Sequence, residues 1–369
     1  MTSFMVLGDG VIKDILLGLS KDEILSFRDQ LEKCLMSISP GTEGDYQPTP
    51  GIINRPEGQR CLFRAFTSAE HAGTKIIITP APNCQQGLHG ILVIVDKCGI
   101  PVGVLNAEEI TGYRTSMSVM IPYYWRRNSE NIVIFGAGKQ ALWHARILLA
   151  LRGGEVKSIS IVNRSADRAR ELIMSVQGEN DRIWKSKCHF NLVSLADVNS
   201  ESRVEMLLSE ADAIFCTVAS TRPLFSLDSL KLKSRGHGCL PFISAVGSWQ
   251  PDMIEIHPDI LHHATASKGY SNDGISTGTV IVDDGKNALL HAGEIVQAGL
   301  REDQIIDLGK LISWKRSVGR RPTDGIKDWL ENGLVVYKSI GVSVTDLAVG
   351  NAILDLSAEK KLGTLVNDF

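Results

Sequence analysis

Short apolar runs alternate with longer amphipathic stretches along the second half of the chain. The apolar runs, bounded by glycine or polar residues, cover 132–135, 158–162, 189–193, 213–217 and 242–246. Residues 140–151, 166–176 and 204–209, which lie between them, carry apolar side chains at helical spacing. Strands that alternate with helices in this order predict a doubly wound parallel sheet. We therefore expect residues 127–334 to form one α/β domain.

The two ends of the chain follow a different pattern. Residues 10–38 have apolar positions at helical spacing with one break, which predicts two helices. Residues 41–60 are rich in glycine, proline and polar residues and predict a loop. Strands are expected at 75–79, 90–95 and 101–105, and helices at 111–124 and 344–360. We expect residues 1–126 and 335–369 to form an α+β domain with a catalytic or dimerising role, on which the C-terminal helix packs.

The most specific local motif is Gly136-Ala137-Gly138-Lys139-Gln140-Ala141, which follows the apolar run 132–135 and leads into a helical stretch. The first glycine allows a tight turn, the second lets the backbone approach a pyrophosphate, and the alanine lets helix and strand pack closely. The amino end of the helix then offers free N–H groups and a partial positive charge to that anion. This context predicts a Rossmann dinucleotide-binding turn in which residues 136–140 contact the cofactor.

The end of the second strand bears on the choice between NAD and NADP. In this fold an acid at that position binds the ribose 2′-hydroxyl of NAD, whereas an arginine accommodates the 2′-phosphate of NADP. Here the strand ends in Asn163-Arg164-Ser165, with no acid at its tip. Arg164 can pair with a phosphate and Ser165 can donate a hydrogen bond, which favours NADPH over NADH. The alternative is that Arg164 is a solvated loop charge, and nearby Asp167 leaves NADH open.

Composition narrows the range of partners. The chain has 369 residues and a formal net charge of −3, so nothing in its charge favours nucleic acid or an anionic membrane. Its seven cysteines are scattered without a CxxC motif, which is typical of reduced thiols inside a cell. No apolar run is long enough for a transmembrane helix. We expect a cytoplasmic protein without a metal site.

Several segments together resemble one protein family. In chain order they are Gly73-x-Lys75, Pro82-Asn83, Asp96-x-x-Gly99-x-Pro101, Thr111-Gly-Tyr-Arg114-Thr115, the glycine motif, Ala245-Val-Gly247-x-x-x-Pro251-Asp252-x-x-Glu255, and Lys338-Ser339-x-Gly341-x-x-x-x-Asp346. Their order and spacing resemble the ornithine cyclodeaminase/mu-crystallin family, NAD(P)-dependent proteins that act on imino and amino acids. The resemblance implies a Rossmann domain and a substrate domain built from both chain ends, which typically pairs across a homodimer.

The substrates of this family carry a carboxylate beside a C=N or C–N bond. Such a group calls for fixed cations, and the planar fork of arginine can bind it through two hydrogen bonds. The resemblance implies substrate-binding roles for Arg55, Lys75 and Arg114, and catalytic roles for the last two. Arg114 also lies in an apolar stretch, where an unpaired charge is costly. Alternatively, Arg114 pairs with Glu108 or Glu109 on the protein surface, and Lys75 faces solvent. Arg60 or Arg64 could take the role given to Arg55.

One position departs from the cyclodeaminase pattern. Where cyclodeaminases proper resemble Val-Gly-x-Asp, with that aspartate as a base, this chain has Trp249. Tryptophan cannot transfer a proton, but it can form an apolar wall for a substrate. The chain therefore resembles the mu-crystallin side of the family, which is associated with ketimine reduction. Asp252 is the candidate proton donor in its place, with Glu255, His263 and His291 as alternatives; Asp252 or Glu255 could instead cap the next helix.

Three loops match family segments that line a nicotinamide ring. They are Thr217-Val218-Ala219, Val246-Gly247 and Ser339-x-Gly341, and the alternative for each is ordinary turn chemistry. Side chains such as Phe66, Trp249 and Tyr270 are expected to set the size of the pocket. We expect NADPH-dependent reduction of the C=N bond of a cyclic imino acid or ketimine. The alternatives are an amino-acid dehydrogenase, a reductive condensing enzyme, a cyclodeaminase-type lyase that uses Asp252, and an NADPH- or small-ligand-binding protein without catalysis.

Overall fold

The computed structural model describes residues 4–38, 43–82, 84, 88–234, 238–266, 277–317, 324–367 and 369. The chain divides into two units, of which the first contains residues 1–114 and 342–369 and the second residues 115–341. The amino-side boundary falls within helix α3 (Ala107–Tyr123) and not at residue 126. Asn83 and Tyr270 lie outside the described residues.

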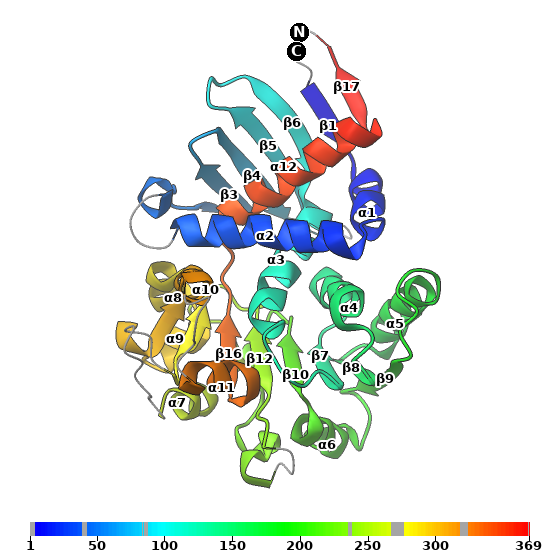
Figure 1. Ribbon diagram of the computed structural model, residues 1–369, viewed down its shortest axis with the longest axis vertical. Coiled ribbons are helices and arrows are strands. Elements are labelled where there is room, and N and C mark those ends of the chain that lie inside the picture. Colours follow the sequence, from blue (N-terminus) through cyan, green and yellow to red (C-terminus); the bar gives the residue numbers. More distant parts are fainter. Residues whose placement is uncertain are drawn as a thin grey trace. The chain divides into compact units, whose positions relative to one another are not determined.

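The second unit is built on an eight-stranded sheet (Figure 1). Its strands are β7 (Asn131–Phe135), β8 (Ser158–Asn163), β9 (His189–Ser194), β10 (Ala213–Cys216), β12 (Phe242–Ala245), β14 (Val280–Val282), β15 (Ile305–Asp307) and β16 (Val335–Lys338). They lie in the order β15-β14-β16-β12-β10-β7-β8-β9, with every described pairing parallel. The strand order reverses between β7 and β10, and ligands of such sheets bind at the carboxyl ends of the strands beside this reversal. The predicted doubly wound sheet is confirmed.

Helices cover both faces of this sheet. All residues of β10, β12 and β16 are buried, and successive side chains of a strand point to opposite faces, so neither face is open. The helices are α4 (Lys139–Arg152), α5 (Ala166–Arg182), α6 (Ser200–Glu210), α7 (Pro258–Ala266), α8 (Gly285–His291), α9 (Gly293–Gln297), α10 (Leu308–Ser317) and α11 (Asp324–Asn332). A small parallel pair, β11 (Thr221–Phe225) and β13 (Ile254–Ile256), accompanies the sheet.

The first unit has a seven-stranded sheet in the order β17-β1-β6-β5-β4-β3-β2. Its strands are β1 (Phe4–Leu7), β2 (Gly51–Asn54), β3 (Arg60–Thr67), β4 (His71–Thr79), β5 (His89–Asp96), β6 (Pro101–Asn106) and β17 (Thr364–Val366). Its helices are α1 (Asp9–Leu17), α2 (Lys21–Ile38), the short helix η1 (Glu43–Tyr46), the first part of α3, and α12 (Ser343–Lys360). None of the described helices of either unit is long and apolar enough to cross a membrane.

Helix α12 lies across one face of the first sheet, where it contacts β3, β4 and β5 (Figure 1). Gly350 allows this approach, because a Cβ there would lie 2.7 Å from a methyl carbon of Leu92. Because helices cover this face, buried and exposed side chains alternate along β5. Leu92 and Ile94 are fully buried under the helices, whereas Ile91 on the opposite face is exposed. The expectation that the C-terminal helix packs on the N-terminal domain is confirmed.

Several boundaries differ from those expected from the sequence. The expected loop at 41–60 contains β2, whose four residues are all exposed, so that no pattern of burial marks it as a strand. Helix α3 begins at Ala107 and not at Thr111, because the Asn106 side chain accepts a hydrogen bond from the N–H of Glu108 and stabilises an earlier start. Residues 335–341 belong to the second unit, since β16 pairs with β12 and β14.

Candidate active site

The turn after β7 has the shape that a dinucleotide phosphate requires. Gly136 has a φ of +107°, and a Cβ there would lie 2.6 Å from Oγ1 of Thr217, so only glycine fits. Gly138 precedes α4, and a Cβ at this position would meet no described atom within 4 Å. Ala141 is fully buried against the sheet. The amino end of α4 therefore combines an open approach, no capping side chain from Gly138, and N–H groups suited to an anion.

The segment after β8 carries the residues expected at the adenosine ribose. The Asn163 amide donates to the carbonyl of Ser165, whose hydroxyl in turn accepts from the N–H of Arg168 and caps α5. Arg164 is exposed and forms no hydrogen bond or ion pair within the described parts of the chain. Asp167 is the acid that kept NADH as an alternative cofactor, and it is paired with Arg170 at 2.6 Å.

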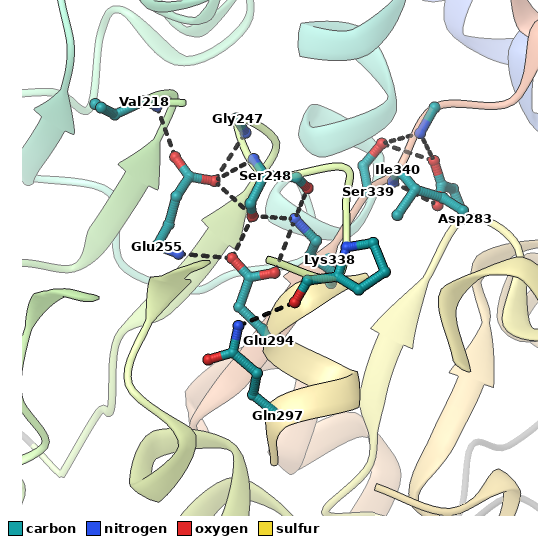
Figure 2. Close-up of polar contacts among 12 residues, drawn as sticks. Val218, Gly247, Ser248, Glu255, Asp283, Glu294, Gln297, Lys338, Ser339 and Ile340 are labelled. Carbon is teal, nitrogen blue, oxygen red and sulfur yellow. Dashed lines mark hydrogen bonds and ion pairs between the residues drawn. The ribbon is translucent and has the colours of Figure 1, made fainter. Parts of the chain in front are cut away.

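The loops after β10 and β12 meet at a buried carboxylate (Figure 2). Glu255 of β13 accepts from the N–H of Val218 at 2.6 Å through one oxygen and from the N–H of Gly247 at 2.7 Å through the other. The N–H of Ser248 also points at the second oxygen, at 3.2 Å. Gly247 has no space for a side chain, because a Cβ there would overlap the backbone of Val218. Two of the loops expected around the nicotinamide are thus fastened to one another.

A second buried carboxylate holds the loop after β16. Asp283 accepts from the hydroxyl of Ser339 at 2.6 Å and from the N–H groups of Ile340 and Gly341 at 3.1 and 2.8 Å (Figure 2). Burial raises the pKa of Asp283, and the hydrogen bond from Ser339 opposes that rise. Ser339 and Gly341 were both expected at the cofactor. They form a turn that is held by the side chain of Asp283, the residue after β14.

In the first unit, charged side chains from three distant segments meet in the interior. Nζ of Lys75 on β4 lies 2.7 Å from Oδ2 of Asp346 on α12, and Nε of Arg114 on α3 lies 3.1 Å from Oδ1 of the same carboxylate. Lys75 also donates to the hydroxyl of Thr111 at 3.3 Å. Lys75 is 1% exposed and Asp346 is not exposed at all, so these charges are shielded from water.

Burial and neighbouring charges set the protonation of this group. Burial lowers the pKa of Lys75 to about 7; Asp346 opposes this, and Arg114 and Arg64 lower it further. Burial alone would raise the pKa of Asp346, but Arg114 and Lys75 outweigh that effect and the net shift is downward. Asp346 is therefore a stable carboxylate, whereas Lys75 changes its charge near neutral pH.

Arg64, and not Arg55, lies beside this group. Arg64 stands directly opposite Lys75 in the β3–β4 pair, so both side chains project from the same face of the sheet. Arg55 is exposed in the turn between β2 and β3, where its N–H donates to the carbonyl of Gln59. Arg60 is bound to the side chain of Asn54 in the same hairpin.

Comparison with known proteins identifies the family. The model of the ornithine cyclodeaminase/mu-crystallin family matches residues 22–361. The chain belongs to this family. One protein with a similar sequence is the Delta(1)-pyrroline-2-carboxylate reductase of Bacillus cereus, which is 25% identical over 80% of each chain.

Solved structures of other proteins share the fold over nearly the whole chain. An archaeal alanine dehydrogenase dimer with bound NAD superposes with a TM-score of 0.72 at 16% identity, covering all of both chains. The Delta(1)-pyrroline-2-carboxylate reductase of Thermococcus litoralis, in complex with NADH and L-proline, gives 0.73 at 15% identity, covering 98% of this chain and 100% of the other. At these identities the likeness concerns the fold.

The remaining predicted site residues differ in their exposure to solvent. Asp252 is exposed in the turn before β13, and neither caps α7 nor forms a hydrogen bond or ion pair with any described residue. Trp249 is half-buried in the loop after β12. His263 on α7 and His291 at the end of α8 are exposed. Glu255 does not cap α7 either, because its carboxylate binds the two loops.

Several buried charged residues had no role assigned from the sequence, among them Asp283, Asp346, Glu294 and Lys338. Asp346 stands within the apolar positions of the helix expected at 344–360, the same signal that singled out Arg114. Glu294 and Lys338 form an ion pair at 3.1 Å; Lys338 opens one of the family segments, whereas nothing local marks Glu294. An ionised side chain in an apolar helix is costly unless paired, so Asp346 could have been found.

Proposed function

We propose that this family member uses NADPH to reduce the C=N bond of a cyclic imino acid or ketimine to the corresponding amino acid. The observation that carries the proposal is the buried group of Lys75, Arg114 and Asp346, with Arg64 beside it. Lys75, Arg114 and Arg64 bring cationic side chains together here, and cations of this kind attract the carboxylate of a substrate. The relative from Bacillus cereus is named for a cyclic imine that carries a carboxylate.

Each residue of this group is assigned one task. Arg114 binds the substrate carboxylate through its guanidinium, with Arg64 adding positive charge. Arg55 is a further carboxylate contact only if its exposed turn closes on the ligand. Lys75, with a pKa of about 7, is partly ammonium at neutral pH and can act as a general acid. Asp346 keeps that proton on Lys75.

The reduction adds one hydride and one proton across the double bond. When bound, the cofactor supplies the hydride from C4 of its nicotinamide ring. Lys75 gives its proton to the imine nitrogen, which makes the neighbouring carbon a better hydride acceptor, and regains a proton from water after the product leaves. Trp249 has no proton to exchange and serves as an apolar wall. Asp252 is the second candidate for the donor.

NADPH, and not NADH, is the proposed cofactor. The exposed guanidinium of Arg164 is available to a 2′-phosphate, whereas the nearest acid, Asp167, is already paired with Arg170. The glycine turn 136–140 would hold the pyrophosphate, and the loops at 217–219, 246–247 and 339–341 would border the nicotinamide. The two solved structures named above contain NAD and NADH respectively, which supports a nicotinamide cofactor in general.

A homodimer is the proposed assembly. The face of the first sheet opposite α12 carries apolar side chains, several of them exposed, including Val6, Phe63 and Ile91. A sheet face with several exposed apolar side chains is typical of a surface that binds another protein. A second copy of the chain is the partner we propose, since the solved alanine dehydrogenase relative is a dimer. Sedimentation of wild type and Ile91→Lys, expected to be dimer and monomer respectively, tests this.

The function is tested by a screen for NADPH consumption. The substrates are five- and six-membered cyclic imino acids and pairs of a 2-oxo acid with an amine. We expect turnover with at least one cyclic imino acid, loss of that turnover in Lys75→Met, and unchanged NADPH affinity in the variant. Ammonia release from a diamino acid without net cofactor oxidation would instead identify a cyclodeaminase. Tight NADPH binding without turnover of any substrate would identify a non-catalytic binding protein.

A further inference from the structure

Glu255 is buried at the junction of two loops that the proposed function places around the nicotinamide. Its relative exposure is 0%, so it does not contact a ligand from solvent. One carboxylate oxygen serves Val218 in the loop after β10, and the other serves Gly247 and Ser248 in the loop after β12. These three donors are backbone N–H groups, which cannot become acceptors; the Ser248 hydroxyl lies 3.3 Å from the second oxygen as a further donor. Only an ionised carboxylate satisfies both loops at once.

A second layer fixes Glu255 itself. The N–H of Glu255 donates to Oε1 of Glu294 at 2.8 Å, and the hydroxyl of Ser248 reaches the same carboxylate (Figure 2). Nζ of Lys338 lies 3.1 Å from Oε2 of Glu294 and 2.6 Å from Oγ of Ser248. Strands β13 and β16 and helix α9 thus share one buried network with the loop after β12.

Helix α9 also supports the rest of that loop, including the turn that follows Trp249. The Gln297 amide donates to the carbonyl of Pro251 at 3.0 Å. Gly293 faces the loop so closely that a Cβ would overlap the carbonyl of Met253. The loop that carries Trp249 is therefore held at Gly247 and Ser248 by buried carboxylates and at Pro251 by the exposed side chain of Gln297.

We propose that Glu255 is a positioning residue, whose ionised carboxylate holds the loops after β10 and β12 in the arrangement that accepts the nicotinamide half of the cofactor. The inference rests on the proposed use of a nicotinamide cofactor. It adds a residue that touches neither cofactor nor substrate and acts through the backbone of Val218 and Gly247. The adenosine half of the cofactor, bound at the turn after β7 and the end of β8, does not depend on Glu255.

This arrangement makes nicotinamide binding sensitive to acid. Three titratable groups face Glu255: Lys338 from β16, Glu294 from α9 and the Cys216 thiol from β10. Burial raises the pKa of Glu255 to about 7, with Lys338 opposing the rise and Glu294 adding to it. Below that pH a proton occupies one carboxylate oxygen and turns an N–H of one loop away. Acid should therefore weaken the hold on the nicotinamide and leave the adenosine site unchanged.

The test compares two ligands that differ by the nicotinamide half. The affinities of NADPH and of 2′,5′-ADP are measured by calorimetry for wild type, Glu255→Gln and Glu179→Gln. Glu179 is the matched control, because it is also a buried carboxylate of the second unit, paired with Arg146 at 2.6 Å and placed on α5 away from the loops. NADH and ADP replace these ligands if NADH is the preferred cofactor.

Glu255→Gln should bind NADPH about tenfold or more weakly, because its amide can serve one loop only, and bind 2′,5′-ADP as wild type does. Glu179→Gln should lower the melting temperature and change neither affinity. Unchanged NADPH affinity in Glu255→Gln overturns the proposal, and so does an equal loss of both ligands in that variant. Wild type that binds no nicotinamide cofactor at all refutes the proposed function first, and the role of Glu255 falls with it.

Wild type alone gives a second test, should Glu255→Gln fail to fold. The ratio of NADPH affinity to 2′,5′-ADP affinity should fall as the pH drops through about 7. A ratio that stays constant from pH 8 to pH 6 contradicts the proposal. In a folded Glu255→Gln the ratio should be low and should not change over this range.

Discussion

The ammonium nitrogen of Lys75 lies 2.7 Å from Oδ2 of Asp346, although 271 residues separate them along the chain. Asp346 is the nearby group that favours the charged form of Lys75, against burial and the two arginines. The pKa of about 7 is the balance of these effects, so it should respond to each of them in a stated direction.

Asp346→Asn should move the pH dependence of the reduction to more acidic values. In wild type, kcat/KM should fall as the pH rises through about 7, because Lys75 loses the proton that it must donate. Without the carboxylate, burial and the arginines lower the pKa of Lys75 further. The pH profile of kcat/KM measures this. An identical profile in the variant contradicts the assignment, and a profile moved by Asp252→Asn points to Asp252 as the donor.

Arg64→Met should move the same profile in the opposite direction. The positive charge of Arg64 lowers the pKa of Lys75, so its removal should keep Lys75 protonated at higher pH. The alkaline fall in kcat/KM should therefore begin later than in wild type. Arg60→Met is the matched control, because Arg60 lies on the same strand and its guanidinium is bound to Asn54. Equal profiles for wild type and Arg64→Met would remove Arg64 from the group.

Arg114→Ala should raise the substrate KM by about ten- to a hundredfold, the usual worth of a charge-assisted hydrogen bond. NADPH affinity should change little, because the cofactor turn belongs to the other unit. Steady-state kinetics and direct titration of NADPH separate the two effects. Arg55→Ala should have a smaller effect, since Arg55 is exposed in a turn. Near-normal kinetics in Arg114→Ala would exclude it from carboxylate binding.

Arg164→Asp should reverse the preference between the two cofactors. An acid at this position repels a 2′-phosphate and can accept a hydrogen bond from a ribose 2′-hydroxyl. We expect NADPH affinity to fall by about tenfold or more while NADH affinity holds or improves. Arg182→Asp, at the far end of α5, controls for the change in net charge. NADPH affinity that is the same before and after the substitution refutes the assignment of the 2′-phosphate site.

Gly136→Ala and Gly138→Ala should separate folding from phosphate binding. Alanine at 136 requires a φ of +107° and a contact with Thr217, so it should destabilise the protein by about 1–2 kcal/mol or more and lower cofactor affinity. Alanine at 138 meets no described atom, so the melting temperature should hold while the methyl group obstructs the pyrophosphate. Thermal unfolding and NADPH titration are the measurements. A Gly138→Ala protein with wild-type affinity would contradict a phosphate site at this turn.

The second unit was predictable because its signals are local. Strand, glycine turn and helix are consecutive from Asn131 to Arg152, and the backbone conformation at Gly136 requires a glycine. The central strands are buried on both faces, so they appear in the sequence as uninterrupted apolar runs. The edge strand β2 is exposed throughout, which is why the sequence predicted a loop there.

The partners of the charged residues required the tertiary structure. The sequence selected Lys75 and Arg114 as candidates, but Asp346 reaches them only because α12 packs across the first sheet. The sequence suggested Glu255 as a proton donor or a helix cap. Its hydrogen bonds with Val218 and Gly247 depend on the folded chain, which brings these two loops to β13 although they are distant from one another in sequence.

The sequence by itself thus determined the family, the parallel sheet and the glycine turn after β7, since backbone geometry and burial leave a record in neighbouring residues. The tertiary structure alone decided which carboxylate accompanies each buried cation and which one joins the loops. The physical reason is that the energy of a buried charge depends on the groups within a few ångströms of it, and chain folding brings those groups from anywhere in the sequence.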